Sequence, residues 1–431
     1  MKNSIMFLIL LFILGCKNSD NMVAPTPLPC YFGLCDTSKL EVVWQKSFCT
    51  DTSQCNSFAP QLSNNLTLYS TDGCKAILDT LRFFDSKNGT AVSKWFDYLP
   101  DNTVTARSDS KRYKNYHFFT TGNFIYGIDL LTGNTKFRSS TNGTGGPRLN
   151  VQEDFVYHTR SLSFGVHDIE SYLVKSSIDE VKWDTVFIQK KIGDFEPTFI
   201  EMPCIWTNPD GDKIAIFQIR FVDRTRTNTT IPDERTDLVA YNMNQKKEYF
   251  RFNDIDSFKG GSVQLPNIIG NRAYVAFSKS IYCFDLINKT IIWQKQFIND
   301  ETFSSGNPFL LVNGKLYVKP DNRSLYALNP DTGSQISVNL DTGSGASDMV
   351  YYKGLIYFTS FGTDKIYAIE EATGKKIWAE PSPNTYKATY NNFRSFSNSG
   401  LGGSGLAIDT INDYLFTSDY YFMMCLKLPK R

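Results

Sequence analysis

The sequence predicts an all-β protein, an eight-bladed β-propeller of four-stranded antiparallel blades whose ring is closed by strands from the N- and C-termini. Three observations lead to this fold class. A pattern repeats with a period of roughly 42 to 46 residues, about the length of one propeller blade. Its strands alternate apolar and polar side chains, and each end of the chain carries only part of a repeat.

Each repeat contains an apolar-aromatic-small-apolar-acidic strand, a turn that often ends in Thr-Gly, and a strand with an aromatic residue. The clearest copies begin at Ile125, Ile281, Leu325 and Ile366, and weaker copies begin at Leu81 and Leu238 and surround Tyr172. We expect the aromatic residue of the last strand at Trp44, Trp95, Phe137, Trp183, Phe250, Trp293 and Trp378, and Ile336 in its place in one unit.

Two other positions of the repeat have a physical explanation. The small residue should lie where neighbouring blades approach too closely for a large side chain; it is Gly127, Ala240, Cys283, Ala327 or Ala368. The turn requires a residue with positive φ, which glycine adopts without steric cost. We therefore expect the Thr-Gly glycines in tight hairpins between the last two strands of a blade.

The two ends of the chain are predicted to share one blade. Residues 40–48 form an aromatic strand without preceding partners, and residues 414–418 and 423–428 form strands without a following aromatic strand. Pairing them would remove two exposed sheet edges, which otherwise invite aggregation. Residues 40–431 are therefore predicted to be a single propeller domain.

The N-terminus is predicted to be a lipoprotein signal peptide, residues 1–15. Residues 5–14 are an unbroken apolar run, too short to span a membrane, and it ends in Ile13-Leu14-Gly15-Cys16, which resembles a bacterial lipobox. Cys16 would then carry the lipid, and residues 16–39 would be a tether. Because Lys17 rather than aspartate follows, we expect the outer membrane, facing the periplasm or the cell surface. The alternative is an ordinary cleaved signal with a chance cysteine.

The repeat resembles that of the pyrroloquinoline-quinone (PQQ) type of β-propeller. This family includes quinoprotein dehydrogenases and non-enzymatic lipoproteins similar to BamB, a scaffold of the outer-membrane barrel-assembly machinery. The dehydrogenases often stack PQQ on a vicinal disulfide, whereas no two cysteines are adjacent here. We therefore expect no catalytic residues and no cofactor, and a non-catalytic scaffold with a protein partner in the envelope. The alternative is a quinoprotein-like or carbohydrate-binding propeller that uses its axial funnel.

Two long connections between predicted strands are candidate sites for a partner, because propellers place function on long loops. Residues 220–237 carry Arg220, Arg224, Arg226 and Arg235, and residues 101–116 carry Lys111 and Arg112. The alternative is that both are solvated hairpins. A net charge of +1 gives no global field for binding nucleic acid.

The cysteines and histidines suggest no metal site. Cys30 with Cys35 and Cys49 with Cys55 are candidate local disulfides, but the sequence leaves other pairings open. Cys283 and Cys425 fall at the small position and should be buried thiols. None of the three histidines has metal-ligand spacing, so no metal is expected.

Overall fold

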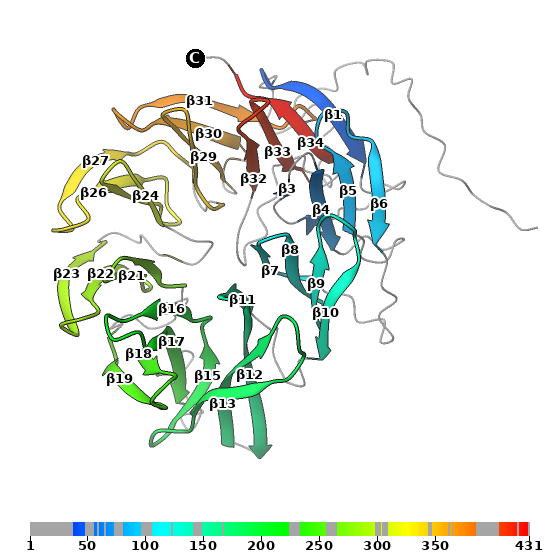
Figure 1. Cartoon of the computed structure of the whole chain (residues 1–431). Coiled ribbons are helices and arrows are strands. Elements are labelled where there is room, and N and C mark those ends of the chain that lie inside the picture. Colours follow the sequence, from blue (N-terminus) through cyan, green and yellow to red (C-terminus); the bar gives the residue numbers. More distant parts are fainter. Residues whose placement is uncertain are drawn as a thin grey trace, which may run out of the picture.

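The chain is an all-β propeller in which every described element is a strand (Figure 1). The computed structural model describes residues 38–47, 56–57, 60–63, 66–72, 81–95, 106–121, 124–140, 149–165, 168–223, 233–255, 265–297, 303, 309–343, 347–360, 363, 365–384, 405–419 and 422–429. The strands form eight antiparallel sheets. Seven are each built from one continuous stretch of chain, and the eighth combines strands from both ends.

The first four continuous sheets occupy the N-terminal half of the chain. The first contains β2 (Asn56–Ser57), β3 (Gln61–Ser63), β4 (Leu66–Asp72), β5 (Leu81–Asp85) and β6 (Ala91–Trp95). The second contains β7 (Ala106–Tyr113), β8 (Tyr116–Thr121), β9 (Phe124–Asp129) and β10 (Thr135–Ser140). The third contains β11 (Leu149–Gln152), β12 (Phe155–Gly165), β13 (Asp168–Ser177) and β14 (Asp184–Gln189). The fourth contains β15 (Phe195–Ile200), β16 (Cys204–Thr207), β17 (Lys213–Asp223), β18 (Glu234–Asn242) and β19 (Lys247–Phe252).

The other sheets follow in the same manner. The fifth contains β20 (Asn267–Ile269), β21 (Arg272–Ala276), β22 (Ser280–Asp285) and β23 (Thr290–Gln296). The sixth contains β24 (Phe309–Val312), β25 (Lys315–Val318), β26 (Leu325–Leu328) and β27 (Gln335–Asn339). The seventh contains β28 (Val350–Tyr352), β29 (Leu355–Ser360), β30 (Lys365–Glu370) and β31 (Lys376–Pro381). The composite sheet contains β1 (Glu41–Ser47), β32 (Leu406–Asp409), β33 (Tyr414–Ser418) and β34 (Phe422–Lys427).

The strand register confirms most of the aromatic positions and corrects three. The small and aromatic positions face each other in five sheets, as in Gly127 opposite Phe137, Ala240 opposite Phe250, Cys283 opposite Trp293, Ala368 opposite Trp378 and Cys425 opposite Trp44. In the other three sheets the residues assigned to this position were wrong. Ser93, Phe187 and Ser337 occupy it instead of Trp95, Trp183 and Ile336.

Trp183 was misplaced because the third sheet has longer strands than the repeat predicts. It precedes β14, and its indole Nε1 donates a hydrogen bond of 2.6 Å to the hydroxyl of Ser139 in the second sheet. Its ring meets that of Phe137 edge-on, with centroids 6.1 Å apart. The indole therefore still joins two neighbouring sheets, but from a connecting segment instead of a strand.

The turn glycines lie in the hairpins predicted for them. Gly333 has a φ of +68°, and its amide donates to the carbonyl of Asn329, which directly follows strand β26. A Cβ atom on Gly333 would stand 2.6 Å from the ring of Trp293, and the indole Nε1 of Trp293 donates to the carbonyl of Pro330 at 2.9 Å. The repeat thus pairs a glycine with a tryptophan because one sheet's turn packs on the previous sheet's indole.

Hydrophobic clusters fill the spaces between consecutive sheets. Cys283 lies in a cluster with Leu316 and Val318 of the next sheet, and Ala368 lies with Leu415 and Leu426. The small residues therefore do lie between sheets, as predicted. Because each sheet packs both faces on neighbours, the apolar core is distributed around the ring rather than gathered at its centre.

The composite sheet pairs β1 with β34 in antiparallel register from Glu41 opposite Lys427 to Ser47 opposite Phe422. One face packs on the seventh sheet, where Leu426 lies with Ile366. The other packs on the first sheet, where Trp44 lies with Phe84. The Trp44 indole contacts Gly89 as Trp293 contacts Gly333 and donates to the carbonyl of Ser86 at 2.9 Å.

Candidate functional surface

Several residues singled out from the sequence lie outside the described residues. These are Cys16, the candidate disulfide residues Cys30, Cys35, Cys49 and Cys55, and the arginines Arg224 and Arg226. Arg220, Arg235, Lys111 and Arg112 are described, and the surface is built from them and their neighbours.

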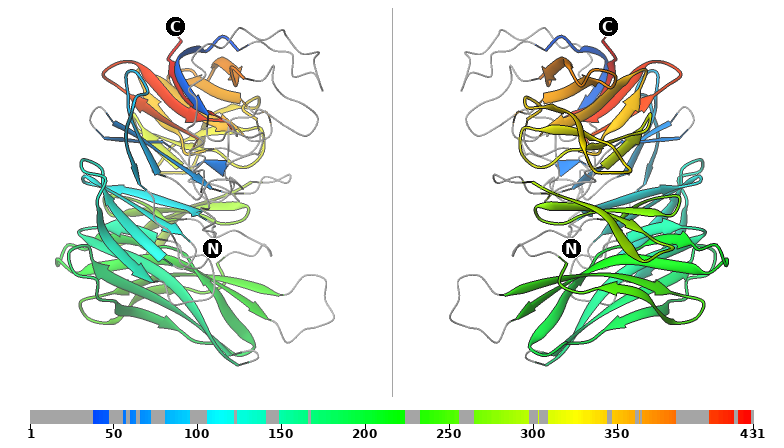
Figure 2. Two further views of the ribbon diagram at one scale, coloured as in Figure 1. Left: turned by 90° about the vertical axis from the view of Figure 1, so that its right-hand side faces the viewer. Right: turned by 90° about the vertical axis from the view of Figure 1, so that its left-hand side faces the viewer.

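The antiparallel strands give the ring two faces of different character (Figure 2). We call one the turn face; it carries the tight turns between first and second strands, such as 114–115, 153–154, 313–314 and 353–354, and those between third and fourth strands. We call the opposite one the connection face; it carries the hairpin ends of β12–β13 and β17–β18 and the links between sheets. Three of those four strands have 10 or 11 residues, against 3 to 8 in the strands of most other sheets.

Ion pairs on the turn face connect several pairs of consecutive sheets. The ammonium of Lys114 lies 2.6 Å from the carboxylate of Asp154, and that of Lys213 lies 2.7 Å from Glu153. Similar pairs join Arg272 to Asp331, Lys315 to Glu371 and Lys353 to Asp413. Each exposed pair contributes little alone, typically about 0–1 kcal/mol. Much of the charge on this face is thus already paired within the chain.

Arg220 and Arg235 lie in the β17–β18 hairpin close to the loop that joins its two strands, on the connection face. The sequence placed them in a long loop, but β17 runs to Asp223 and β18 begins at Glu234, so both lie in strands. Alternating apolar residues such as Phe221 extend the strands beyond the predicted blade. Arg220 pairs with Glu234, its Nε atom donating to Oε2 at 3.2 Å.

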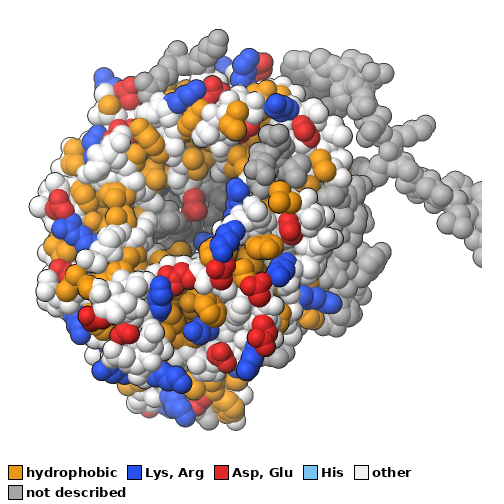
Figure 3. Space-filling view, viewed as in Figure 1, with side chains coloured by type: hydrophobic (Ala, Val, Ile, Leu, Met, Phe, Trp, Pro, Cys, Tyr) orange, Lys and Arg blue, Asp and Glu red, His pale blue; other side chains and the backbone are white. Residues whose placement is uncertain are grey.

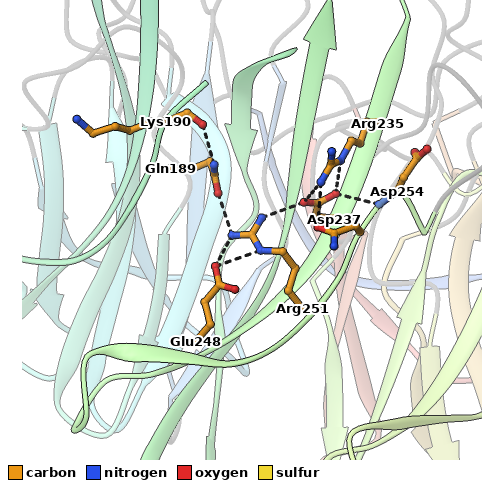
Figure 4. A network of polar contacts seen from close by, with 8 residues as sticks. Gln189, Lys190, Arg235, Asp237, Glu248, Arg251 and Asp254 are labelled. Atoms are coloured by element: carbon orange, nitrogen blue, oxygen red, sulfur yellow. Dashed lines mark hydrogen bonds and ion pairs between the residues drawn. The ribbon is translucent and has the colours of Figure 1, made fainter. Parts of the chain in front are cut away.

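Arg235 belongs to a polar network around a buried carboxylate (Figure 4). Asp237 is fully buried and accepts from Nε of Arg235 at 2.7 Å and from its Nη2 at 2.9 Å. Arg251 donates to the same carboxylate at 2.9 Å and to Gln189 of the third sheet at 3.0 Å, and the amide of Asp254 donates at 2.9 Å. The hydrogen bond to Asp237 raises the pKa of Arg235. The network therefore holds the hairpin and joins two sheets.

Lys111 and Arg112 do not join the arginines of the hairpin. They were predicted in a long connection, but they lie in strand β7, opposite Phe118 and His117 of β8. Arg112 is exposed, donates to the carbonyl of Leu62 in the first sheet, and lies close to the 114–115 turn of the turn face. The two groups of basic residues thus lie in different sheets, toward opposite ends of the strands.

His117 and His158 are buried strand residues. Neither ring nitrogen of His117 has a hydrogen-bond partner, and its ring stacks on Phe119 with centroids 5.7 Å apart. Burial lowers the pKa of His117 to about 3, so the ring is neutral at physiological pH. His158 packs edge-on against Trp183 at 5.9 Å. His167 lies outside the described residues.

The described thiols are poorly suited to nucleophilic chemistry. Burial raises the pKa of Cys204 and of Cys283 to about 11, and it also raises the pKa of Cys425. Trp206, which was not assigned to the repeat, packs in the core between the fourth and fifth sheets. Within the described part of the chain, no group of His, Cys, Asp and Glu side chains is arranged to hold a metal ion, and no helix is long and apolar enough to cross a membrane.

Sequence reasoning missed Asp237 and Arg251. The signal was present in β18, where an acidic residue interrupts an otherwise apolar alternation that continues with Val239. A charged residue at a core position is rarely fully buried without a partner. The pattern could therefore have indicated that nearby arginines pair with this buried carboxylate and are not available to a partner protein.

Part of the chain matches a known protein family. Residues 278–407 match the PQQ_2 family model, described as outer membrane protein assembly factor BamB. The comparison with curated proteins found no match.

Solved structures agree on the fold. BamB from Moraxella catarrhalis aligns with a TM-score of 0.53 at 12% identity, covering 90% of this chain and 100% of that one. A europium-containing methanol dehydrogenase aligns with a TM-score of 0.60 at 11% identity, covering 91% and 94%. Sqt1 from Saccharomyces cerevisiae aligns with a TM-score of 0.58 at 9% identity, covering 89% and 98%. At these identities the likeness concerns the fold alone.

Proposed function

Because this chain is a β-propeller protein of the PQQ type, we propose that it is a non-catalytic, membrane-anchored scaffolding lipoprotein of the cell envelope. Its role would be to bind a protein partner in outer-membrane protein assembly or in a surface complex. The observation that carries the proposal is the match of residues 278–407 to the BamB family model. Fold alone does not decide function, so the proposal is tested by binding and not by further comparison.

The anchor in this proposal is a lipid on Cys16, with residues 1–15 as the signal peptide and 16–39 as the tether. The support is the apolar run that ends in Gly15-Cys16. We expect Cys16→Ser to abolish palmitate labelling and to release the protein from the membrane fraction, while the wild type remains with it. Labelling that persists in Cys16→Ser would exclude the lipobox assignment.

The ring in this proposal is a closed, eight-bladed scaffold whose seam is the composite sheet. Two kinds of contact support it: the pairing of β1 with β34, and the clusters that join the composite sheet to the sheets on both sides. A closed ring leaves no broad sheet face without a neighbour. It would present the connection face as a rigid platform on which the longer hairpins stand.

We propose the connection face as the partner-binding surface. On the opposite face, several exposed charges are already paired within the chain, as in Lys114–Asp154, Lys213–Glu153 and Lys353–Asp413. Strand β17 carries Arg220, which pairs with Glu234 near the connection face, and Arg224 and Arg226 follow this strand in the sequence. Arginine is enriched among residues that dominate binding energy at protein interfaces.

The deciding experiment is capture of envelope proteins by the full lipidated chain. A triple variant, Arg220→Ala with Arg224→Ala and Arg226→Ala, should capture less of the same partner than the wild type does. Arg235 is left in place because it holds the buried carboxylate of Asp237. The matched control replaces three turn-face lysines, Lys114, Lys213 and Lys353, with alanine. Equal capture by both variants would reject the connection face, and no specific capture by the wild type would reject the scaffold role.

The alternative, a quinoprotein-like propeller, is tested separately. If the scaffold proposal is right, the purified chain supplied with PQQ and Ca²⁺ should develop no protein-bound quinone absorbance band after gel filtration. A stoichiometric band would replace the scaffold proposal with an enzymatic one.

A further inference from the structure

The outermost strand of the sixth sheet, β27, differs from the other outer strands of the ring. Those strands are β1, β6, β10, β14, β19, β23 and β31, and each contains at least one charged residue, such as Lys94, Lys295 or Lys376. Strand β27 reads Gln-Ile-Ser-Val-Asn and contains none. Charged residues, lysine above all, are the usual protection of a sheet edge against pairing with another chain. Among the described outer strands, β27 alone lacks this protection.

The side chains of this edge divide into two rows. Ser337 and Asn339 face the seventh sheet: the Ser337 hydroxyl lies 3.2 Å from the position of a Cβ on Gly374, and the Asn339 amide donates to the Gly374 carbonyl at 2.9 Å. Ile336 lies at the register irregularity of this strand, Val338 points to the other side because side chains alternate along a strand, and Leu340 directly follows the strand. They are 51%, 37% and 68% exposed.

The exposed row continues an apolar surface. Val338 lies opposite Tyr326, whose ring packs against Phe297 of the fifth sheet at 5.1 Å. Hydrophobic side chains reach the surface at this part of the rim in the space-filling view (Figure 3). An apolar row thus borders a strand edge that pairs with no described strand.

Serine at position 337 is part of the same local departure from the repeat. In six other sheets this position carries an aromatic residue, and two of these residues pack on a turn glycine of the next sheet, Trp44 on Gly89 and Trp293 on Gly333. With Ser337 in its place, β27 sets only a small hydroxyl side chain against Gly374 of the seventh sheet.

We propose that the free edge of β27 binds an extended, uncharged segment of a partner protein by adding it to the sixth sheet as a further strand. Backbone hydrogen bonds would supply the affinity, and alternate apolar side chains of the segment would pack on Ile336, Val338 and Leu340. A second copy of this chain is a less favourable partner for this edge than an extended segment of another protein. Two rigid edges of five residues would bury far less than the roughly 1,200–2,000 Å² of a stable protein interface.

This inference rests on the proposed scaffolding function and names the chemistry of one partner contact. The test uses the purified full chain and a capped nine-residue peptide of alternating valine and threonine with a Gly-Ser-Lys tail. We expect the peptide to bind and to slow hydrogen exchange of the amides of residues 335–339. Val338→Lys should weaken this binding at least tenfold, because a lysine would be placed in the edge and its apolar row.

The matched control is Val92→Lys, which adds the same charge to an exposed valine of β6, a strand whose sequence already contains Lys94. It should leave peptide binding unchanged, and both variants should melt as the wild type does. A peptide with proline at two central positions should not bind. Equal binding to Val338→Lys and Val92→Lys, protection of amides elsewhere, or no binding by the wild type would overturn the proposal.

The two proposals fail independently. The peptide assay needs no envelope extract, so its failure would leave the captured partners of the scaffold unaffected. Conversely, a wild-type chain that captures no envelope protein would reject the scaffolding role, while peptide binding and its loss in Val338→Lys would still describe the β27 edge.

Discussion

The buried imidazole of His117 makes the stability of the ring depend on pH. The pKa is lowered to about 3 by burial, whereas an unfolded chain has an imidazole pKa near 6.5. Below about pH 6.5 the unfolded state therefore takes up a proton that the folded state does not. The stability associated with the neutral ring is fully present above pH 6.5 and decreases as the pH falls toward 3.

We expect His117→Phe to make the free energy of unfolding less dependent on pH below pH 6.5. One proton difference is worth about 1.4 kcal/mol per pH unit, so between pH 6.5 and 5 the wild type should lose about 2 kcal/mol more than the variant. Urea unfolding at half-unit pH intervals measures this. All other titrating groups are common to both proteins and cancel in the difference. Parallel curves would show that His117 does not titrate between the two states.

We expect Arg235 to stabilise the fold and not to bind a partner. Its guanidinium forms two hydrogen bonds to Asp237, which is fully buried. Hydrogen bonds to charged groups contribute about 1.5–3 kcal/mol each, and Arg251 remains to compensate part of the loss. We therefore expect Arg235→Ala to lower the free energy of unfolding by about 2 kcal/mol in urea titrations with an unchanged m-value.

The control for this prediction is Arg272→Ala, which breaks the exposed pair with Asp331 on the turn face. Both partners are more than a third exposed, so the change should be below about 1 kcal/mol. If the two variants were equally stable, the Asp237 network would contribute nothing beyond a surface ion pair.

At the scale of single elements, the sequence predicted where the tight turns lie better than it predicted how far each strand extends. The turns of Gly133, Gly333 and Gly374 were predictable from the sequence. Each requires a residue with positive φ, which favours glycine, and each follows an acidic or amide residue four positions earlier. Strand β7 was not, because its sequence, Ala-Arg-Ser-Asp-Ser-Lys-Arg-Tyr, is polar and resembles a loop. Its strand character depends on pairing with β8, which is a tertiary effect that local propensity does not contain.

The same limit explains the errors in the aromatic positions. Each sheet has a register irregularity next to the small residue, as between Cys283 and Phe284, and it shifts which later residue lies opposite. Counting along the chain therefore found Trp293 but placed Ile336 where Ser337 lies. The network of Asp237 could not be predicted in full because its partners Gln189 and Arg251 lie 48 residues before and 14 after it, in two sheets.

At the scale of the whole molecule, the repeat predicted the propeller because each unit carries the same physical requirements. A strand face must be buried, a small residue must allow close approach, and a turn must pack on the preceding indole. The candidate site lacks such repetition, so its residues could be named from the sequence only as exposed charges. Their pairing, as in Arg220 with Glu234, depends on register across a hairpin and emerged only from the structure.

The strand that joins the two ends of the chain should be required for the whole ring. Strand β34 pairs with both β1 and β33, and Met423, Met424 and Leu426 are fully buried. Each buried side chain of this size contributes roughly 1.5–3 kcal/mol, and a domain is stable by only about 5–15 kcal/mol in total. We expect deletion of residues 423–431 to give insoluble protein, measured as the soluble fraction after expression.

A shorter deletion separates this effect from a general sensitivity of the C-terminus. Removing only residues 430–431 leaves β34 whole, and we expect soluble protein that melts as the wild type does. Without β34, two things are lost together: the cluster around Leu426 and Ile366, and the β1 contact through which Trp44 reaches Gly89. Both neighbouring sheets would then expose apolar faces. A soluble 423–431 deletion with one cooperative melting transition would mean that the sheets are stable as an open array, and that the seam of the ring is not where β1 meets β34.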